Sequence, residues 1–342
     1  MSEFVFFKLP HQSKINHWQG SFKEFDFGLS ELESDIFLLS EFNAGIKGLG
    51  LIPNNKNSFN SNQYFELEYC FKNISVSDTQ EFEYTAIVKK AQSEMTKSDE
   101  LKKTVLSRTK VVSKEIELLE SFYKLCDHFP QSLVYLASSI KHGTWLGASP
   151  EVFLSINENK FETYALAGTK TALQEWTSKE IEEQNWVTVY IENILKDLEI
   201  SYKKSALETV QSGEIQHLKT SFNAAVNNLS TYPKLFEKLN PTPAVGGLEK
   251  QKAMALIQVL EKNKRELYSG VVGPIFKDAK ANLYVNLRCL QAFSDSYCLY
   301  AGAGITAASV PENEWLETER KIQNTQKHLM VKGSPLQATK TE

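Results

Sequence analysis

AGAGITAASVPENEWLETERKIQNTQ, residues 301–326, is the stretch around which the rest of the chain is organised. Alternating Ala and Gly residues at 301–304 end an apolar run, and a short turn follows. Pro311 is tolerated in the first turn of a helix, because the first helical N–H groups have no intrahelical partner. The stretch therefore predicts a strand with a glycine-rich end and a helix that begins near Ser309 and Pro311.

The first turns of this predicted helix are acidic. Glu314 and Glu317 are three residues apart and Lys321 follows four later, so all three project from one helix face, whereas Trp315 points elsewhere. Carboxylates beside glycines, which admit close backbone approach, suit a hard cation and an anionic ligand. The alternative is a solvated acidic turn that complements the helix dipole. This stretch alone does not decide between them.

Composition favours a globular protein with a small-molecule partner. The chain has 342 residues, of which 42% are apolar, enough to pack the core of one large domain or two small ones. The net charge is −4 without a basic block, which argues against nucleic acid or a membrane surface as the main partner. The N-terminal MSEFVFFKLPHQSK lacks a signal-peptide pattern, and no apolar run approaches the length of a membrane span. We expect a cytoplasmic location.

Cysteine and histidine spacing argues against a zinc site or a disulfide framework. No CxxC, HxxxH or HExxH pattern occurs, so reduced core thiols are expected and oxygen atoms are the only credible metal ligands. The four cysteines are Cys70, Cys126, Cys289 and Cys298.

Residues 1–90 carry short apolar strings that predict strands. These are FVFFKL, DIFLLSEF and YFELEYCF, and the polar run PNNKNSFNSNQ predicts a flexible loop between two of them. A helical pattern covers Glu81 to Lys97.

The middle of the chain is rich in predicted strands. In the strand TVLSR, alternation places Lys103 and Val105 on one face, so Lys103 is either buried or a solvated lysine at the strand start. A helix stopped by Pro130 and several strands follow. In GASPE, Glu151 comes directly after a proline at the head of an apolar strand, where it is either a functional carboxylate or a charge at a sheet edge.

A second helix with paired glutamates is predicted after LAGT. Thr177 and Glu180 form a capping-box pattern, which explains Glu180 but not Glu183. Further on, His217 falls in a polar loop, and Gly246 and Gly247 precede a helix. Arg288 stands in the middle of a predicted strand, where its buried guanidinium would need a carboxylate partner.

Seven motifs in order resemble the chorismate-utilising enzymes, a family of isochorismate, salicylate, anthranilate and aminodeoxychorismate synthases. The motifs are KTVLSR, GASPE, LAGT, NPTPAVGG, RELYSGVVG, NLRC and AGAGI…EWLET. The resemblance covers about Ser93 to Gln326 and implies one α+β domain, with a two-layer, largely antiparallel sheet core flanked by helices. We expect residues 1–90 to add divergent strands to that domain, 91–330 to form the chorismate-binding region, and 331–342 to be a disordered tail.

Two positions indicate the branch of the family. The segment 241–247, PTPAVGG, resembles the isochorismate synthase version of a motif that contains GAP in members that add ammonia. Ala167 stands where aminodeoxychorismate synthases place a nucleophilic lysine. Water is therefore the simpler nucleophile, and no glutaminase subunit is expected.

The resemblance also implies roles for individual residues. Lys103 is the expected base, in a motif where Thr104 replaces the usual valine, and Glu151 is the expected acid, whose carboxyl must carry a proton, as burial would favour. Mg²⁺ is expected on Glu183 and Glu317, with support through water from the remaining two glutamates of the helix starts, Glu180 and Glu314.

The substrate's anionic groups are expected to meet cations and glycine-rich backbone. His217 matches a family histidine near the ring, to which we assign no catalytic role. The expected substrate-binding residues are Gly168, Thr169, Arg288, Gly302, Gly304 and Lys321.

The leading hypothesis is thus a monomeric, Mg²⁺-dependent isochorismate synthase that serves menaquinone or siderophore synthesis. The nearest rival is a salicylate synthase, which makes isochorismate and then eliminates pyruvate. A chorismate-binding protein without activity is a third hypothesis, but it would not need both an acid and a base.

Overall fold

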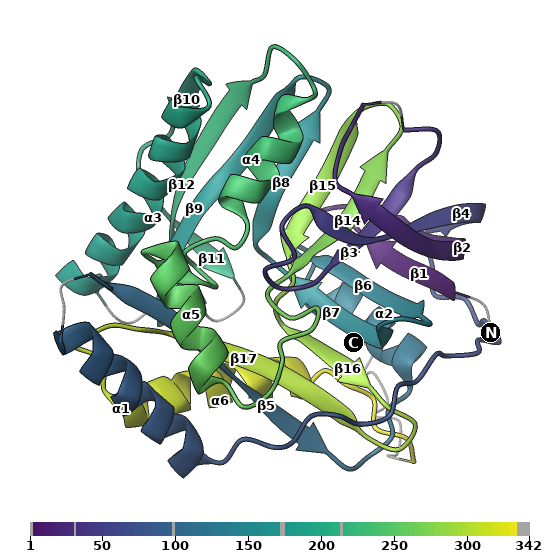
Figure 1. The fold of residues 1–342 in the computed structure, drawn as a ribbon. Helices are drawn as coiled ribbons and strands as arrows, with labels where there is room; N and C mark the ends of the chain where they lie inside the picture. Colours follow the sequence, from purple (N-terminus) through teal and green to yellow (C-terminus); the bar gives the residue numbers. More distant parts are fainter. Residues whose placement is uncertain (1–2, 31, 98–99, 172–174, 213–214, 334–342) are drawn as a thin grey trace.

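The structure is a computed structural model (Figure 1). It describes residues 3–30, 32–97, 100–171, 175–212 and 215–333. The helices are α1 Glu81–Lys97, α2 Leu118–His128, α3 Ser178–Asp197, α4 Thr231–Leu239, α5 Lys250–Leu260 and α6 Pro311–Gln326. The strands are β1 Glu3–Lys8, β2 Ile15–Asp26, β3 Ile36–Ser40, β4 Lys47–Phe59, β5 Lys103–Val112, β6 Leu133–Ser139, β7 Gly143–Ser149, β8 Val152–Asn157, β9 Lys160–Thr171, β10 Tyr202–Lys204, β11 Glu208–Ser212, β12 Ile215–Ala225, β13 Gly247–Leu248, β14 Val271–Phe276, β15 Lys280–Val285, β16 Cys289–Ala292 and β17 Tyr297–Ile305.

The α+β class and the antiparallel sheet core predicted from the sequence are confirmed. Each pairing between the described strands is antiparallel, and the pairings connect all of them. Strands β1, β3, β6, β7 and β14 bury large side chains against one another, including Phe37, Tyr135 and Trp145. Each such side chain contributes about 1.5–3 kcal/mol when it leaves water. The N-terminal strands are thus part of the same core.

Helices cover the sheet on different sides (Figure 1). Helices α3 and α4 pack with β9 and β12, and their apolar residues join those of β8 and β15 in one cluster. Helix α2 packs on β6 and β7. Helices α1, α5 and α6 lie together along β5 and β17, around Tyr84, Ile257 and Ile305.

The pairing of β5 with β17 brings two of the predicted motifs together. Gly304 lies opposite Val105, and Gly302 lies opposite Ser107. A Cβ atom on Gly304 would come within 2.8 Å of the Lys103 Cε atom. The glycines at 302 and 304 therefore allow the start of β5 to pass close to the end of β17.

The predicted helix starts are confirmed. Helix α1 spans the predicted residues, and α6 begins at Pro311 as its first helical residue. Helix α3 follows Thr177, whose backbone N–H donates to Glu180 Oε2 at 3.0 Å in a capping box.

Two predictions for the N-terminal region were wrong. Most of the polar run after Ile52 is not a loop, because β4 continues to Phe59 and pairs with β2, and only residues 60–63 lie outside the strand. Pro53 lies at the irregularity of that ladder, where a missing N–H is tolerated. The string 64–71 is not a strand: Cys70 bonds to side chains, its N–H donating to Ser138 Oγ and its carbonyl accepting from Thr144 Oγ1.

Two further predictions were wrong in the C-terminal half. Arg288 does not stand in a strand but between β15 and β16, with a left-handed φ of 48°. His217 does not lie in a loop but in β12, which pairs with β9 and β11. The expected disordered tail, 331–342, begins with placed residues, since Val331 bridges to Ile116 and the Lys332 N–H donates to the Glu115 carbonyl at 2.9 Å. Residues 334–342 lie outside the described residues, as do 98–99 and 172–174.

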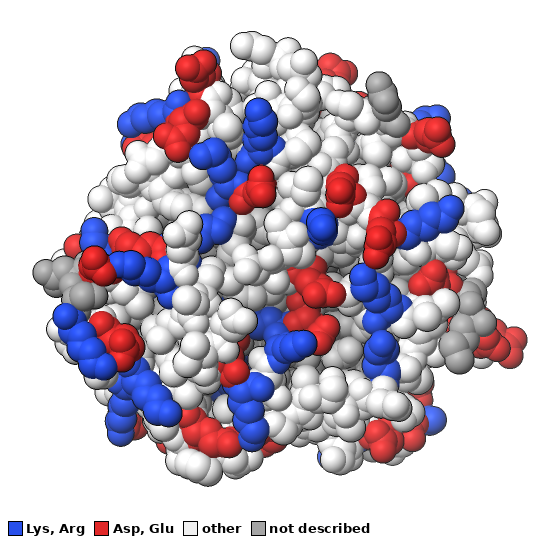
Figure 2. Space-filling model, viewed as in Figure 1, with Lys and Arg blue, Asp and Glu red and all other residues white. Residues whose placement is uncertain are grey.

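The surface is of mixed charge. Figure 2 shows acidic and basic side chains interspersed over the visible face, without a broad area of one sign. None of the helices in the described part of the chain is long and apolar enough to cross a lipid bilayer.

Candidate active site

One pocket collects residues from all of the motifs that carried the resemblance. It is formed by β5, β17 and α6 on one wall and by β9, α3 and the turn before β8 on the other. Thr169 is the exception among the expected site residues, since its side chain lies outside the described part. The expected residues that line the pocket are Lys103, Glu151, Gly168, Glu180, Glu183, Arg288, Gly302, Gly304, Glu314, Glu317 and Lys321.

Lys103 is buried at the first position of β5. The residue is 4% exposed, so the alternative of a solvated lysine at the strand start is wrong. Its Nζ atom lies 3.6 Å from Glu183 Oε2, an ion pair between β5 and α3. The lysine therefore crosses from one wall of the pocket to the other.

Glu151 occupies the turn between β7 and β8. The carboxyl is buried, with the residue 9% exposed, and burial raises its pKa to about 7. Lys103 and Lys321 oppose that rise in pKa but do not cancel it. The Glu151 carboxyl therefore keeps its proton to a higher pH than an exposed glutamate does, which suits an acid catalyst.

The α6 wall holds its charges in fixed positions. Lys321 Nζ donates to Glu317 Oε1 at 2.7 Å and to the Gly302 carbonyl at 2.8 Å. Glu314 is 6% exposed, which excludes a solvated acidic turn as the explanation for this residue. The first turns of α6 are thus bound to the glycine-rich end of β17.

The α3 wall is arranged differently. Glu180 accepts from the Thr177 backbone, and Gln184 Nε2 donates to the Ala165 carbonyl at 2.9 Å, which fixes α3 against β9. Gly168, with φ 70°, leaves room for Glu180, because a Cβ atom there would lie 3.1 Å from the Glu180 Cβ atom.

His217 joins the pocket from β12. Its Nδ1 atom lies 2.9 Å from the Gly168 carbonyl, and because a carbonyl only accepts, Nδ1 carries the hydrogen. Burial, with a smaller contribution from Arg288 and Lys321, lowers the His217 pKa to about 4. The ring is therefore neutral near pH 7 and leaves Nε2 as a hydrogen-bond acceptor.

Arg288 supplies a buried cation. Burial lowers its pKa to about 10, which still leaves the guanidinium charged at neutral pH. Its backbone is left-handed between β15 and β16, so Arg288 interrupts the strand that the sequence pattern predicted. A charged guanidinium in a pocket is suited to a carboxylate ligand.

Two tyrosines of the pocket wall were not expected from the sequence. Tyr268 and Tyr300 stack with ring centroids 5.5 Å apart, and burial raises both of their pKa values. A signal existed, since Tyr268 lies in RELYSGVVG and Tyr300 directly precedes AGAG. Apolar neighbours made both look like ordinary core residues.

The four glutamates of α3 and α6 offer hard oxygen donors to a metal such as Mg²⁺. They face one pocket, which fits the chemistry of that ion. Within the described ranges, however, the only three acidic or histidine side chains with ligand atoms all within 4.8 Å lie elsewhere. An ion in the pocket would therefore take few of its ligands from the protein and the others from water and substrate.

Comparison with known proteins identifies the family of the chain. The family model described as "Chorismate binding enzyme" matches residues 52–330. The chain belongs to the chorismate binding enzyme family. The match begins before residue 91, so part of the N-terminal strand region is included in it.

Relatives within the chorismate binding enzymes come from two branches. The chain is 30% identical over 193 residues to isochorismate synthase EntC of Escherichia coli (strain K12), covering 53% of this chain and 49% of that protein. It is 25% identical over 265 residues to anthranilate synthase component 1 of Thermococcus kodakarensis, covering 73% of this chain and 60% of that protein. The chain thus spans about half the length of the curated relatives it matches.

The fold agrees with solved structures over most of the chain. The menaquinone-specific isochorismate synthase MenF from Escherichia coli superposes with a TM-score of 0.81, covering 95% of this chain and 88% of that chain, at 18% identity. At this identity the likeness concerns the fold alone.

Proposed function

We propose that this protein is an isochorismate synthase, which isomerises chorismate to isochorismate with the aid of Mg²⁺. One observation carries the proposal: a buried lysine and a glutamate with a pKa of about 7 line the same pocket. A base and an acid are the two groups that an exchange of ring hydroxyls requires.

The proton transfers assign one step to each residue. Lys103, in its neutral form, takes a proton from water as the water oxygen bonds to ring carbon C2. The ring double bonds shift, the C4–oxygen bond breaks, and Glu151 gives its proton to the departing hydroxyl, which leaves as water. One water enters and one leaves, so the reaction is an isomerisation.

Pocket charge supports a divalent cation. With Lys103 neutral and Glu151 protonated, as the proposed step begins, four glutamates face two basic side chains, which leaves two negative charges before substrate binds. A dicarboxylate such as chorismate adds two more, and a bound Mg²⁺ would supply the opposite charge and hold a substrate carboxylate. We propose Glu183 and Glu317 as its ligands, with Glu180 and Glu314 acting through water.

The remaining residues orient the substrate. Arg288 and Lys321 are the proposed contacts of its carboxylates, and backbone at Gly168, Thr169, Gly302 and Gly304 allows close approach. Ala167 lines the pocket where a lysine nucleophile would add a covalent step, so water is the nucleophile we propose.

The test is incubation of the purified protein with chorismate and Mg²⁺, with the products separated by chromatography. Isochorismate without pyruvate is the expected result. Salicylate with pyruvate would identify a salicylate synthase instead. Anthranilate in the presence of ammonium salts would place the chain with its other relatives, and unchanged chorismate would identify a binding protein.

The same proposal includes the biological setting. Names of the relatives connect isochorismate synthases with menaquinone and with vibriobactin, so either kind of pathway could use the product. We further propose a cytoplasmic monomer that needs no glutaminase subunit. Sedimentation of the purified protein at micromolar concentration tests the monomer.

A further inference from the structure

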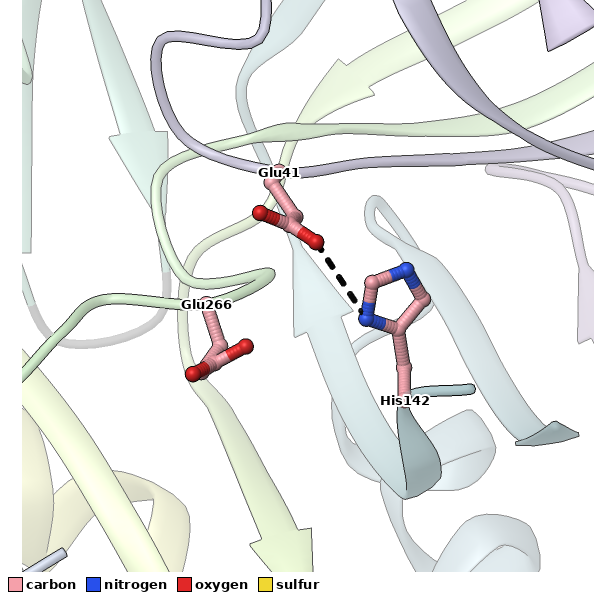
Figure 3. A group of neighbouring side chains, drawn as sticks. All are labelled: Glu41, His142 and Glu266. Carbon is pink, nitrogen blue, oxygen red and sulfur yellow. Dashed lines mark ion pairs between the residues drawn. The ribbon is translucent and has the colours of Figure 1, made fainter. Parts of the chain in front are cut away.

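A second group of metal-ligating side chains lies outside the pocket. Glu41, His142 and Glu266 each bring one ligand atom within 4.8 Å of the other two (Figure 3). Glu41 follows β3, His142 stands in the turn before β7, and Glu266 lies between α5 and β14. Three segments far apart in the sequence therefore converge on one point.

The backbone fixes this convergence. The Phe42 N–H donates to the Glu266 carbonyl at 3.0 Å, which ties the ends of two of the segments together. The His142 carbonyl accepts from Trp145 Nε1 at 2.9 Å and from Gln291 Nε2 at 3.1 Å. Backbone hydrogen bonds thus fix the segments that carry the three side chains.

His142 is aimed into the group without a hydrogen bond to it. Its side chain is 5% exposed, and Nδ1 lies 3.7 Å from Glu41 Oε1, beyond hydrogen-bond distance. The buried imidazole thus faces two carboxylates without a hydrogen bond to Glu41, and each of the three side chains keeps a ligand atom for an ion.

The two carboxylates bring like charges close together. One oxygen of Glu41 and one of Glu266 lie within 4.8 Å of each other. Lys72, Lys141 and Lys264 act electrostatically on the group, yet no ion pair within 4.0 Å joins any of the three to Glu41 or Glu266 in the described structure. Glu266 also has a left-handed φ of 50°, a conformation that costs energy for a residue other than glycine.

We propose that Glu41, His142 and Glu266 bind a divalent transition-metal ion of the zinc class. One imidazole nitrogen and two carboxylate oxygens suit Zn²⁺ better than Mg²⁺, which prefers an all-oxygen shell. The Glu41 side chain is 47% exposed, so the ion can enter from solvent and retain water as a fourth ligand.

The ion would clamp the loop before β14 to two strands. In that loop Arg265 donates to the Val105 and Val245 carbonyls, and Tyr268 lines the pocket. The metal site is therefore structural and lies behind the wall of the candidate active site. It does not depend on the proposed reaction.

The test is calorimetric titration of Zn²⁺ into the chelator-treated full chain at neutral pH, together with Co²⁺ absorption spectra. Wild type is expected to bind one Zn²⁺ that Glu266→Gln and His142→Gln weaken at least about tenfold, the effect of about 1.4 kcal/mol. The double variant Glu183→Gln, Glu317→Gln removes pocket carboxylates and is expected to keep this ion. Equal binding by wild type and Glu266→Gln would overturn the proposal, as would loss of the ion in the double variant.

Thermal unfolding separates metal binding from a purely structural role. Zn²⁺ is expected to raise the melting temperature of wild type, because a ligand of the native state stabilises it. Without metal, Glu266→Gln should melt close to wild type, and a fixed Zn²⁺ concentration should raise its melting temperature less than that of wild type. An equal rise in Glu266→Gln and wild type would contradict the proposed ligand.

Discussion

Helices α3 and α6 both begin beside the pocket and both carry glutamates three residues apart, yet the two pairs are held in different ways. On α6, Glu317 is paired within its own helix by Lys321, which also bonds to Gly302 of β17. On α3, Glu180 serves the helix cap and Glu183 reaches across to Lys103. The α6 pair is therefore held by its own wall, whereas Glu183 depends on the other wall.

This difference shows that equal spacing does not define equal roles. The capping hydrogen bond occupies an oxygen of Glu180 and leaves Glu183 as the better ligand of its helix. Glu314 is buried, although its position in the α6 sequence does not predict burial. The substitutions below test each part of the contrast.

The largest effect is expected from Lys103→Ala, which removes both the proposed base and the connection between the walls. Turnover should fall by about 10²–10⁴-fold, the usual contribution of a general base. Product formation from chorismate measures it, and circular dichroism checks that the fold is retained. Lys110→Ala is the matched control, because Lys110 lies on the same strand but pairs with Glu319 outside the pocket. Near-normal turnover of Lys103→Ala would rule out this base.

The second-largest effect on turnover is expected from Glu151→Gln, which changes a residue outside both helices. Turnover should fall by about 10²–10⁴-fold, and in the wild type the limb of the pH profile that reports the acid should decline above about pH 7. A decline at the same pH in the Gln variant would assign the titration to another group.

Stability adds an independent measure at the same position. Because the folded-state pKa lies above the usual 4.5, the folded protein holds more protons between pH 4.5 and 7 and loses stability as the pH rises through that window. The loss amounts to about 3 kcal/mol for a shift of this size. Glu151→Gln should remove this dependence, so urea unfolding at pH 5 and pH 8 should show a smaller difference than in wild type. An unchanged difference would contradict a buried, titrating Glu151.

Substitution of the paired glutamates is expected to change the Mg²⁺ requirement in a graded way. Glu317→Gln and Glu183→Gln should each raise the Mg²⁺ concentration for half-maximal activity at least about tenfold, since each removes a proposed direct ligand worth more than 1.4 kcal/mol. Glu180→Gln should raise it less, because its carboxylate is engaged by the cap. Activity as a function of Mg²⁺ measures all three, and an unchanged titration for Glu317→Gln would remove that residue from the ligand set.

Local sequence signals were sufficient for the helix starts and the sheet class. Pro311, the Thr177 and Glu180 pair and the glycines of β17 act through neighbours in the chain, so their structures could be predicted. Positions that depend on distant partners could not. The polar end of β4 is a strand because β2 supplies its hydrogen bonds, and 64–71 is not a strand because the nearest partners are side chains.

The candidate site needed both kinds of information. Burial of Lys103 and Glu314 results from the packing of β5, β17 and α6, which no local pattern reports. Arg288 was misplaced because its apolar neighbours continue an alternation that the backbone interrupts with a left-handed residue. The Glu41, His142 and Glu266 group gave no sequence signal at all, since its members are 101 and 124 residues apart.

The smallest expected effect concerns stability alone and separates the two functions of Glu180. Glu180→Ala removes the acceptor of the Thr177 N–H and should lower the free energy of unfolding by about 1 kcal/mol. Glu180→Gln keeps an acceptor in the capping box and should lower it much less. Urea denaturation measures both. Glu182→Ala is the control, because Glu182 lies two residues further along α3 than Glu180. If Glu180→Gln were as unstable as Glu180→Ala, the charge at the start of α3 rather than the capping hydrogen bond would stabilise this helix. Helix α6 begins at a proline without a side-chain cap. The starts of α3 and α6 would then differ in the charge that stabilises them and not in capping.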